Sequence, residues 1–249
     1  MPAPMPALLL IVSLAVLIWF RRNDVRSFRR FRAVDDSARR QRIFLRWARN
    51  TCLMYLGVPL IGLALLGRIE ALWRVPADLF GPALLAAPGL NDDFLALLAG
   101  SVVAGGVLGA ILALLVRRRR KPARTAVPGL DITPMVPRNR AELLRVIPLA
   151  VNAGISEEVF FRLYLPLLVV LCGAPPAFAF IAVTLIFGLL HRFQGWLGVL
   201  VTAVTGATFA LLYLGTATLL APIAFHLLIN LNSLVLRPAV ALRFPSPAD

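Results

Sequence analysis

Long apolar runs separated by short charged stretches make up most of the chain. Residues 1–20 contain no charged side chain, and further apolar runs follow at about 51–67, 94–116, 143–173, 176–190, 197–214 and 218–236. An uncharged apolar stretch of about 18 or more residues is a candidate transmembrane helix. The pattern therefore predicts an all-α fold, a polytopic transmembrane helix bundle with about seven crossings.

The fourth run, 143–173, differs from the others because it is long and has charged side chains in its middle. A straight crossing needs only about 20 residues. We therefore expect either one tilted helix with bends near Pro148 and Pro166, or two separate pieces. In the second case the bundle would have about eight crossings.

The composition is typical of a membrane protein, and the positions of the basic residues explain the large positive net charge. The chain is 59% hydrophobic with a mean hydropathy of +0.83 and a net charge of +14. Most basic residues lie in two blocks beside apolar runs, Arg21–Arg49 and Arg117–Arg145. A nucleic-acid-binding protein would instead show a soluble basic fold with base-reading elements. We expect a lipid bilayer as the partner of these blocks and no nucleic acid.

The positions of the basic residues predict an orientation. Segment 21–50 holds eleven Arg against three Asp, and segment 117–142 opens with five consecutive basic residues. Because basic loops stay on the cytoplasmic side, we expect both as cytoplasmic loops and 68–93 as an outer loop. The N-terminus then lies outside and the C-terminus in the cytoplasm. The excess of Arg over Lys and the abundance of Ala favour a bacterial source, and hence the inner (cytoplasmic) membrane.

Ionisable side chains within the later apolar runs are the candidates for chemistry. A charge at the bilayer centre costs at least a few kcal/mol, so such residues are functional candidates by default. The candidates are Glu157, Glu158, His191 and His226, and the two histidines are the only ones in the chain. Taken singly, each also has a structural interpretation, as an ion pair, an interfacial side chain or a hydrogen bond between helices.

The spacing of these residues pairs them on helix faces. Glu158 and Arg162 are four residues apart and can neutralise each other, whereas Glu157 lies about 100° round the helix. Glu157 is therefore the carboxylate expected to accept a proton or bind a metal. Four residues also separate Phe187 from His191, and His226 from Asn230, so each pair shares a face.

Together and in this order, the three motifs resemble the CAAX protease and bacteriocin-processing family, which includes the type II CAAX prenyl proteases. That family is marked by Glu-Glu-xxx-Arg, Phe-xxx-His and His-xxx-Asn, which match 157–162, 187–191 and 226–230. The resemblance predicts a protease-like core at 143–236. Residues 1–142 would be N-terminal transmembrane helices with the two basic loops, and 237–249 a C-terminal tail.

The resemblance implies an intramembrane metalloprotease that cleaves a membrane-associated protein or peptide. Peptide hydrolysis needs an activated water and donors for the developing oxyanion. Glu157 is the candidate base, His191 would position the water, and His226 with Asn230 would face the carbonyl. Glu158 and Arg162 would support them. Alternatively, Glu157, His191 and His226 would be three ligands of a zinc ion with one position open for water.

Two other classes of function stay open at this stage. A catalytically inactive immunity or scaffold protein of the same fold would keep the resemblance without turnover. A proton-coupled transporter would use Glu and His as a relay, but no inverted repeat is visible. A rhomboid-type serine protease and a soluble-type zincin are excluded, because the chain has no Gly-x-Ser-Gly and no His-Glu-x-x-His.

Overall fold

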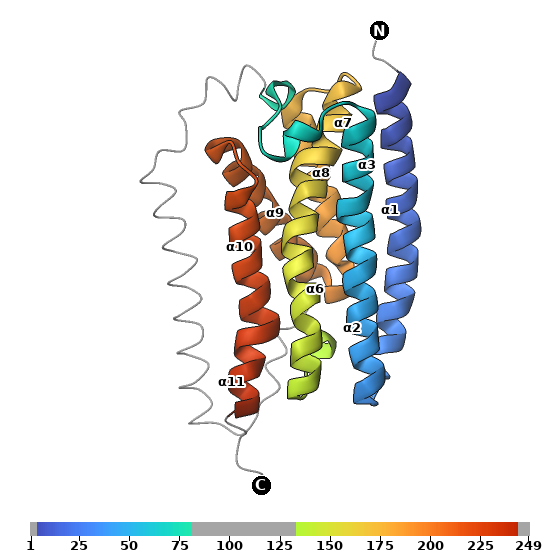
Figure 1. The fold of residues 1–249 in the computed structure, drawn as a ribbon, viewed down its shortest axis with the longest axis vertical. Helices are drawn as coiled ribbons and strands as arrows, with labels where there is room; N and C mark the ends of the chain where they lie inside the picture. The colour runs from blue at the N-terminus through green and yellow to red at the C-terminus, as the bar shows by residue number, and fades with distance from the viewer. Residues whose placement is uncertain (1–3, 81–132, 244–249) are drawn as a thin grey trace.

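The computed structural model describes residues 4–80 and 133–243, and these form a bundle of long helices lying side by side (Figure 1). The described part contains no strand, which confirms the all-α prediction. Five helices in it are long and apolar enough to cross a membrane, at Pro4–Phe31, Ser37–Leu65, Pro176–Gln194, Trp196–Thr216 and Leu220–Arg243. This is fewer than the predicted seven to eight, and the predicted span 94–116 lies outside the described residues.

The chain begins with a helical hairpin. Helix α1 (Pro4–Phe31) is followed by a continuous run of α2 (Ser37–Cys52), the π-helical segment η1 (Leu53–Gly57) and α3 (Val58–Leu65). The Asp36 carboxylate caps α2 by accepting a hydrogen bond from the Arg39 backbone N–H at 2.7 Å. The interpretation of 21–50 as a loop was wrong, because most of it belongs to α1 and α2.

Buried aromatic residues explain why the basic segment is helical. The rings of Phe28 and Phe31 of α1 pack against Trp47 of α2, with centroids 6.4 and 4.7 Å from that of the indole. Arginine is also a good helix former. The apolar faces of these two basic helices therefore build a second core, which is separate from the main one and includes Val146 and Leu149.

Two 3-10 turns follow α3, η2 (Ile69–Leu72) and η3 (Ala77–Leu79), and the described chain resumes at η4 (Thr133–Met135). The next run is helical throughout, from α6 (Arg140–Glu158) through the π-helical segment η5 (Val159–Tyr164) to α7 (Leu165–Leu171). Of the two alternatives for the fourth apolar run, the structure therefore shows one continuous helical element. Pro148 lies within α6, and Pro166 lies in the first turn of α7, directly after the π-helical segment η5.

The last elements form an up-and-down series beside this run (Figure 1). They are α8 (Pro176–Leu190), the 3-10 turn η6 (His191–Gln194), α9 (Trp196–Thr216), α10 (Leu220–Leu231), the π-helical segment η7 (Asn232–Leu236) and α11 (Arg237–Arg243). The predicted tail 237–249 therefore begins as helix, since α11 continues η7 directly. Within the described residues, α1 begins at the opposite end of the bundle from the end of α11 (Figure 1).

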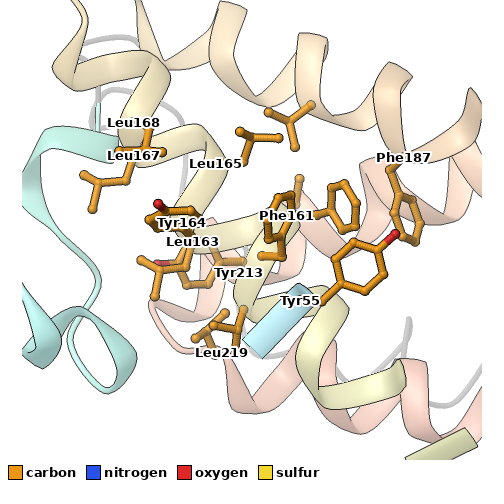
Figure 2. Packing of buried hydrophobic residues seen from close by; sticks show 14 of the residues in the cluster. Tyr55, Phe161, Leu163, Tyr164, Leu165, Leu167, Leu168, Phe187, Tyr213 and Leu219 are labelled. Atoms are coloured by element: carbon orange, nitrogen blue, oxygen red, sulfur yellow. The ribbon is translucent and has the colours of Figure 1, made fainter. Parts of the chain in front are cut away.

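The main core joins the N-terminal hairpin to the later helices. Figure 2 shows Tyr55 of η1 beside Phe161, with Tyr164 and Tyr213 in the same cluster. The Tyr55 ring lies 5.3 Å from that of Phe161, and the Ser13 hydroxyl donates a hydrogen bond to the Tyr164 hydroxyl at 3.2 Å. Residues before 143 and residues within the predicted protease-like core 143–236 thus share one hydrophobic core.

Candidate active site

Four of the six predicted site residues line one cavity of about 560 Å³: Glu157, His191, His226 and Asn230. The cavity has walls from α1, α2, α6, α9 and α10 and reaches the turn η6. A space of this size between polar side chains can hold water. The other two predicted residues, Glu158 and Arg162, are buried beside it.

Glu158 links the first motif to the third. Its Oε1 lies 2.7 Å from His226 Nδ1, across 68 residues of sequence. A carboxylate only accepts hydrogen bonds, so the imidazole donates its Nδ1–H to Glu158. Because Nδ1 carries that proton, Nε2 is the ring atom of His226 that is available for chemistry. Glu158 thereby fixes both the orientation and the tautomer of the ring.

Arg162 provides the counter-charge of Glu158. Its Nε lies 3.1 Å from Glu158 Oε2, which confirms the predicted pair, although the N–H is not aligned for a hydrogen bond. The guanidinium is 1% exposed and lies over the ring of Phe187 at 4.5 Å and over that of Phe209 at 5.6 Å. Cation–π contacts of this kind help to hold a desolvated cation. The pair therefore supports His226 from within the protein.

Glu157 faces the other side of the same imidazole. Its Oε2 lies 4.0 Å from His226 Nε2, and its side chain is 14% exposed. The Glu158 side chain is fully buried. Adjacent carboxylates on α6 thus have different surroundings: one is fixed between His226 and Arg162, and the other borders the cavity. This agrees with the distinction that the helical spacing predicted.

His191 closes α8 at the edge of the cavity. Its Nδ1 lies 2.9 Å from the backbone oxygen of Phe187, and the two rings pack edge to face at 4.9 Å. The carbonyl oxygen can only accept, so Nδ1 donates, and the neutral ring keeps its lone pair on Nε2. The Phe-xxx-His spacing has a direct structural reason, because it places the ring and its acceptor one helical turn apart.

Asn230 joins α10 to α6. Its Nδ2 donates a hydrogen bond to the backbone oxygen of Ala150 at 3.2 Å. A carboxamide has two N–H donors and one oxygen acceptor, so this contact uses only part of its capacity. Asn230 also lines the cavity. It therefore combines contact between helices with a polar group at the site.

The hydrogen bonds of the two histidines resemble those of zinc ligands. In metal sites, a histidine ligand almost always donates its second ring N–H to a carboxylate or a backbone carbonyl. His226 and His191 do so with Glu158 and Phe187. However, in residues 4–80 and 133–243 no three His, Cys, Asp or Glu side chains are gathered closely enough to hold a metal ion. The predicted set Glu157, His191 and His226 does not form a ligand cage in this arrangement.

The N-terminal hairpin contributes residues to the cavity that the motifs did not reveal. Asn23 and Ser27 of α1 and Asn50 and Thr51 of α2 line it. Ser27 also accepts a hydrogen bond from the indole N–H of Trp47 at 3.0 Å. The sequence contained a weak indication of this polar face, because Asn23 and Ser27 are polar residues one helical turn apart. It did not stand out among the arginines around it.

Residues 139–232 match the Rce1-like family, described as type II CAAX prenyl endopeptidase Rce1-like. Searches of curated proteins and of solved structures give no significant match. The matched segment begins at the start of α6 and ends just after Asn230 and α10, so it contains all three motifs. The resemblance predicted from these motifs is therefore confirmed: residues 139–232 carry the sequence pattern of the Rce1-like type II CAAX prenyl endopeptidases.

Proposed function

We propose that this protein is an intramembrane endopeptidase that hydrolyses a peptide bond in a membrane-associated protein or peptide. The observation that carries the proposal is the arrangement around His226. Glu158 holds its Nδ1 at 2.7 Å, while Glu157 lies 4.0 Å from its Nε2 at the cavity. The match of 139–232 to a family named for an endopeptidase supports the same activity.

Glu157 is the general base in this proposal. It borders the cavity together with His191, whose Nδ1–H is already donated to the Phe187 carbonyl. Nε2 of His191 therefore accepts a hydrogen bond from a water molecule, and Glu157 accepts the other water proton. Two acceptors on one water orient its oxygen lone pair toward a carbonyl carbon. A positioned base of this kind contributes about 10²–10⁴-fold to the rate.

His226 and Asn230 stabilise the developing oxyanion. In its doubly protonated form, His226 keeps its Nδ1–H on Glu158 and donates its Nε2–H to the oxyanion, and Asn230 donates the N–H that is not used by Ala150. As water oxygen bonds to the carbonyl carbon, one water proton passes to Glu157. When the C–N bond breaks, Glu157 returns this proton to the departing nitrogen, and the acyl part leaves as a carboxylic acid. Glu158 and Arg162 are positioning residues, because they act through His226.

The location in a bacterial inner membrane, with the N-terminus outside and the C-terminus in the cytoplasm, belongs to the same proposal. The basic end of α1 and α11 lie at one end of the bundle, which supports this orientation (Figure 1). The opposite end holds η2 and η3, where Arg68 pairs with Asp78 at 2.8 Å. The substrate then reaches the cavity from the cytoplasmic side.

The test compares Glu157→Gln with wild type in detergent-purified, full-length protein, using a library of membrane-anchored peptides. We expect wild type to cleave and Glu157→Gln to lose about 10²–10⁴-fold in kcat/KM. Glu70→Gln, which changes an exposed carboxylate at the far end of the bundle, is the matched control and should keep wild-type activity. Thermal unfolding should be unchanged in both variants.

Metal content is measured on the same samples. Cleavage by metal-free wild type, abolished by Glu157→Gln, supports glutamate catalysis. About one zinc per chain, together with loss of cleavage on chelation, would instead support the assignment of zinc to Glu157, His191 and His226. Cleavage that survives Glu157→Gln would overturn the catalytic role of this residue. If no library peptide is cleaved by folded wild type, the inactive immunity or scaffold protein becomes the better interpretation.

A further inference from the structure

We propose that an arginine-lined groove beside the cavity binds an acidic segment of the substrate. The inference rests on the proposed function and assigns it a substrate class, a chain with acidic residues near the scissile bond. The groove has a volume of about 330 Å³ and lies between the basic halves of α1 and α2. Four of its nine lining residues are arginines: Arg26, Arg30, Arg39 and Arg46.

No described ion pair neutralises the positive charge of this groove. None of its lining residues is acidic, and none of the four arginines forms an ion pair among the described residues. The nearby Asp36 carboxylate caps α2 through the Arg39 backbone N–H, and Asp35 lies 3.5 Å from an Arg138 nitrogen. A groove lined by one sign of charge attracts and orients ligands of the opposite sign.

The groove borders the cavity of the proposed active site. Asn23, Ser27 and Arg46 line both spaces. Asn23 and Arg46 are exposed, so the shared rim reaches the surface of the protein. A peptide that leaves the cavity across this rim therefore enters the groove. Its floor is apolar, with Phe31, Val34 and Ile43 buried beneath the arginines.

The shared rim favours a peptide over a lipid headgroup. An anionic headgroup would find the same charges attractive, but it has no reason to reach the rim of the catalytic cavity. A substrate chain must pass through the cavity in order to be cleaved. Carboxylates on such a chain would form bidentate hydrogen bonds with guanidinium groups, a geometry that lysine cannot offer.

The test measures binding, so it does not depend on turnover. Fluorescent peptides of identical sequence, with four Asp, four Asn or four Lys beside the central segment, are titrated against full-length protein in phosphatidylcholine nanodiscs. We expect the Asp peptide to bind about tenfold more tightly than the Asn peptide, with a difference that shrinks at high salt. The Lys peptide should bind most weakly.

Charge-reversal variants locate the effect. Arg30→Glu with Arg39→Glu alters the groove alone, because neither residue lines the cavity. Arg29→Glu with Arg42→Glu is the matched control, with the same change in net charge on the same two helices and both side chains exposed. The first pair should abolish the preference for Asp over Asn, and the second should retain it.

Three results would overturn the inference: equal binding of the Asp and Asn peptides by wild type, equal loss of preference in both double variants, or retention of the preference in the groove variant. Preferential loading of wild type, but not of the groove variant, with phosphatidylglycerol, together with no preference among peptides, would identify a lipid site instead. If the protein prefers the Asp peptide but cleaves no peptide, the protease proposal is contradicted and the proposed binding groove is retained.

Discussion

At the scale of single residues, the structure separates two adjacent glutamates that the sequence could only distinguish by angle. Helical spacing predicted that Glu158 pairs with Arg162, and Arg162 Nε lies 3.1 Å from Glu158 Oε2. The contact of Glu158 with His226 could not be predicted, because it joins residues 68 positions apart and depends on how α10 packs on α6. Glu158 is therefore fixed from two sides, and Glu157 is the carboxylate at the cavity.

This difference predicts that Glu158→Gln, unlike Glu157→Gln, impairs both stability and activity. Glu158 is fully buried, and its neutralisation removes the ion-pair partner of the buried Arg162 guanidinium. Loss of one partner of a buried ion pair costs about 3–5 kcal/mol. We expect a clearly lower melting temperature in detergent, together with loss of peptidase activity. If Glu158→Gln melts like wild type, the Glu158–Arg162 pair does not stabilise the fold.

At the scale of helices, close packing between α3 and η5 places the motif-bearing helix against the N-terminal hairpin. Gly62 faces the ring of Tyr164, and a Cβ at position 62 would overlap that ring. Tyr164 is 1% exposed and is held by Ser13 of α1. The glycine therefore permits the close approach of two helices, as small residues do in membrane proteins.

We predict that Gly62→Ala destabilises the protein by about 1–3 kcal/mol, the usual cost of overpacking a core. Gly57→Ala is the matched control in the same helical run, because the nearest atom to its new Cβ would be 3.9 Å away. The control should melt within about 0.5 kcal/mol of wild type. Adding Tyr164→Phe to Gly62→Ala removes one overlapping atom and should restore part of the loss. Equal melting of the two alanine variants would contradict this packing argument.

Helices that are apolar on all sides were predictable from the sequence, whereas helices with only a narrow apolar face were not. The apolar runs predicted membrane spans at 176–190, 197–214 and 218–236, and α8, α9 and α10 with η7 occupy these positions. The prediction of a loop at 21–50 was wrong, because the many arginines obscured a narrow aromatic face that is buried only where α1 packs against α2. The cavity was likewise not predictable in detail, since its walls come from helices distant in sequence.

At the scale of the whole molecule, a buried ion pair connects the hairpin to the segment that matches the Rce1-like family. Arg40 of α2 donates through Nε to Glu142 Oε2 at 3.0 Å, across 102 residues. Arg40 also donates to the backbone oxygens of Pro134 and Val136. The side chains of Arg40 and Glu142 are 4% and 0% exposed. The start of α2 and the start of α6 are therefore joined at the basic end of the bundle.

This junction predicts an acid-sensitive contribution to stability. Burial alone would raise the pKa of Glu142, but hydrogen bonds from the Arg138 backbone N–H and the Arg40 guanidinium outweigh it and hold the pKa below 4.5, its ordinary value. A lowered folded-state pKa means that the contribution is fully present above the unfolded pKa. It is lost as the pH falls below about 4.5 and through the folded pKa.

We therefore expect Glu142→Gln to be less stable than wild type at pH 7, by about 3–5 kcal/mol, because the buried Arg40 loses its counter-charge. Between about pH 5 and pH 3, wild type should lose stability more steeply than the variant, so the two melting curves converge. Glu70→Gln, an exposed carboxylate outside the junction, should follow wild type throughout. Parallel curves for wild type and Glu142→Gln would show that Glu142 titrates alike in the folded and unfolded states, and its charge would then not stabilise the junction of α2 with α6.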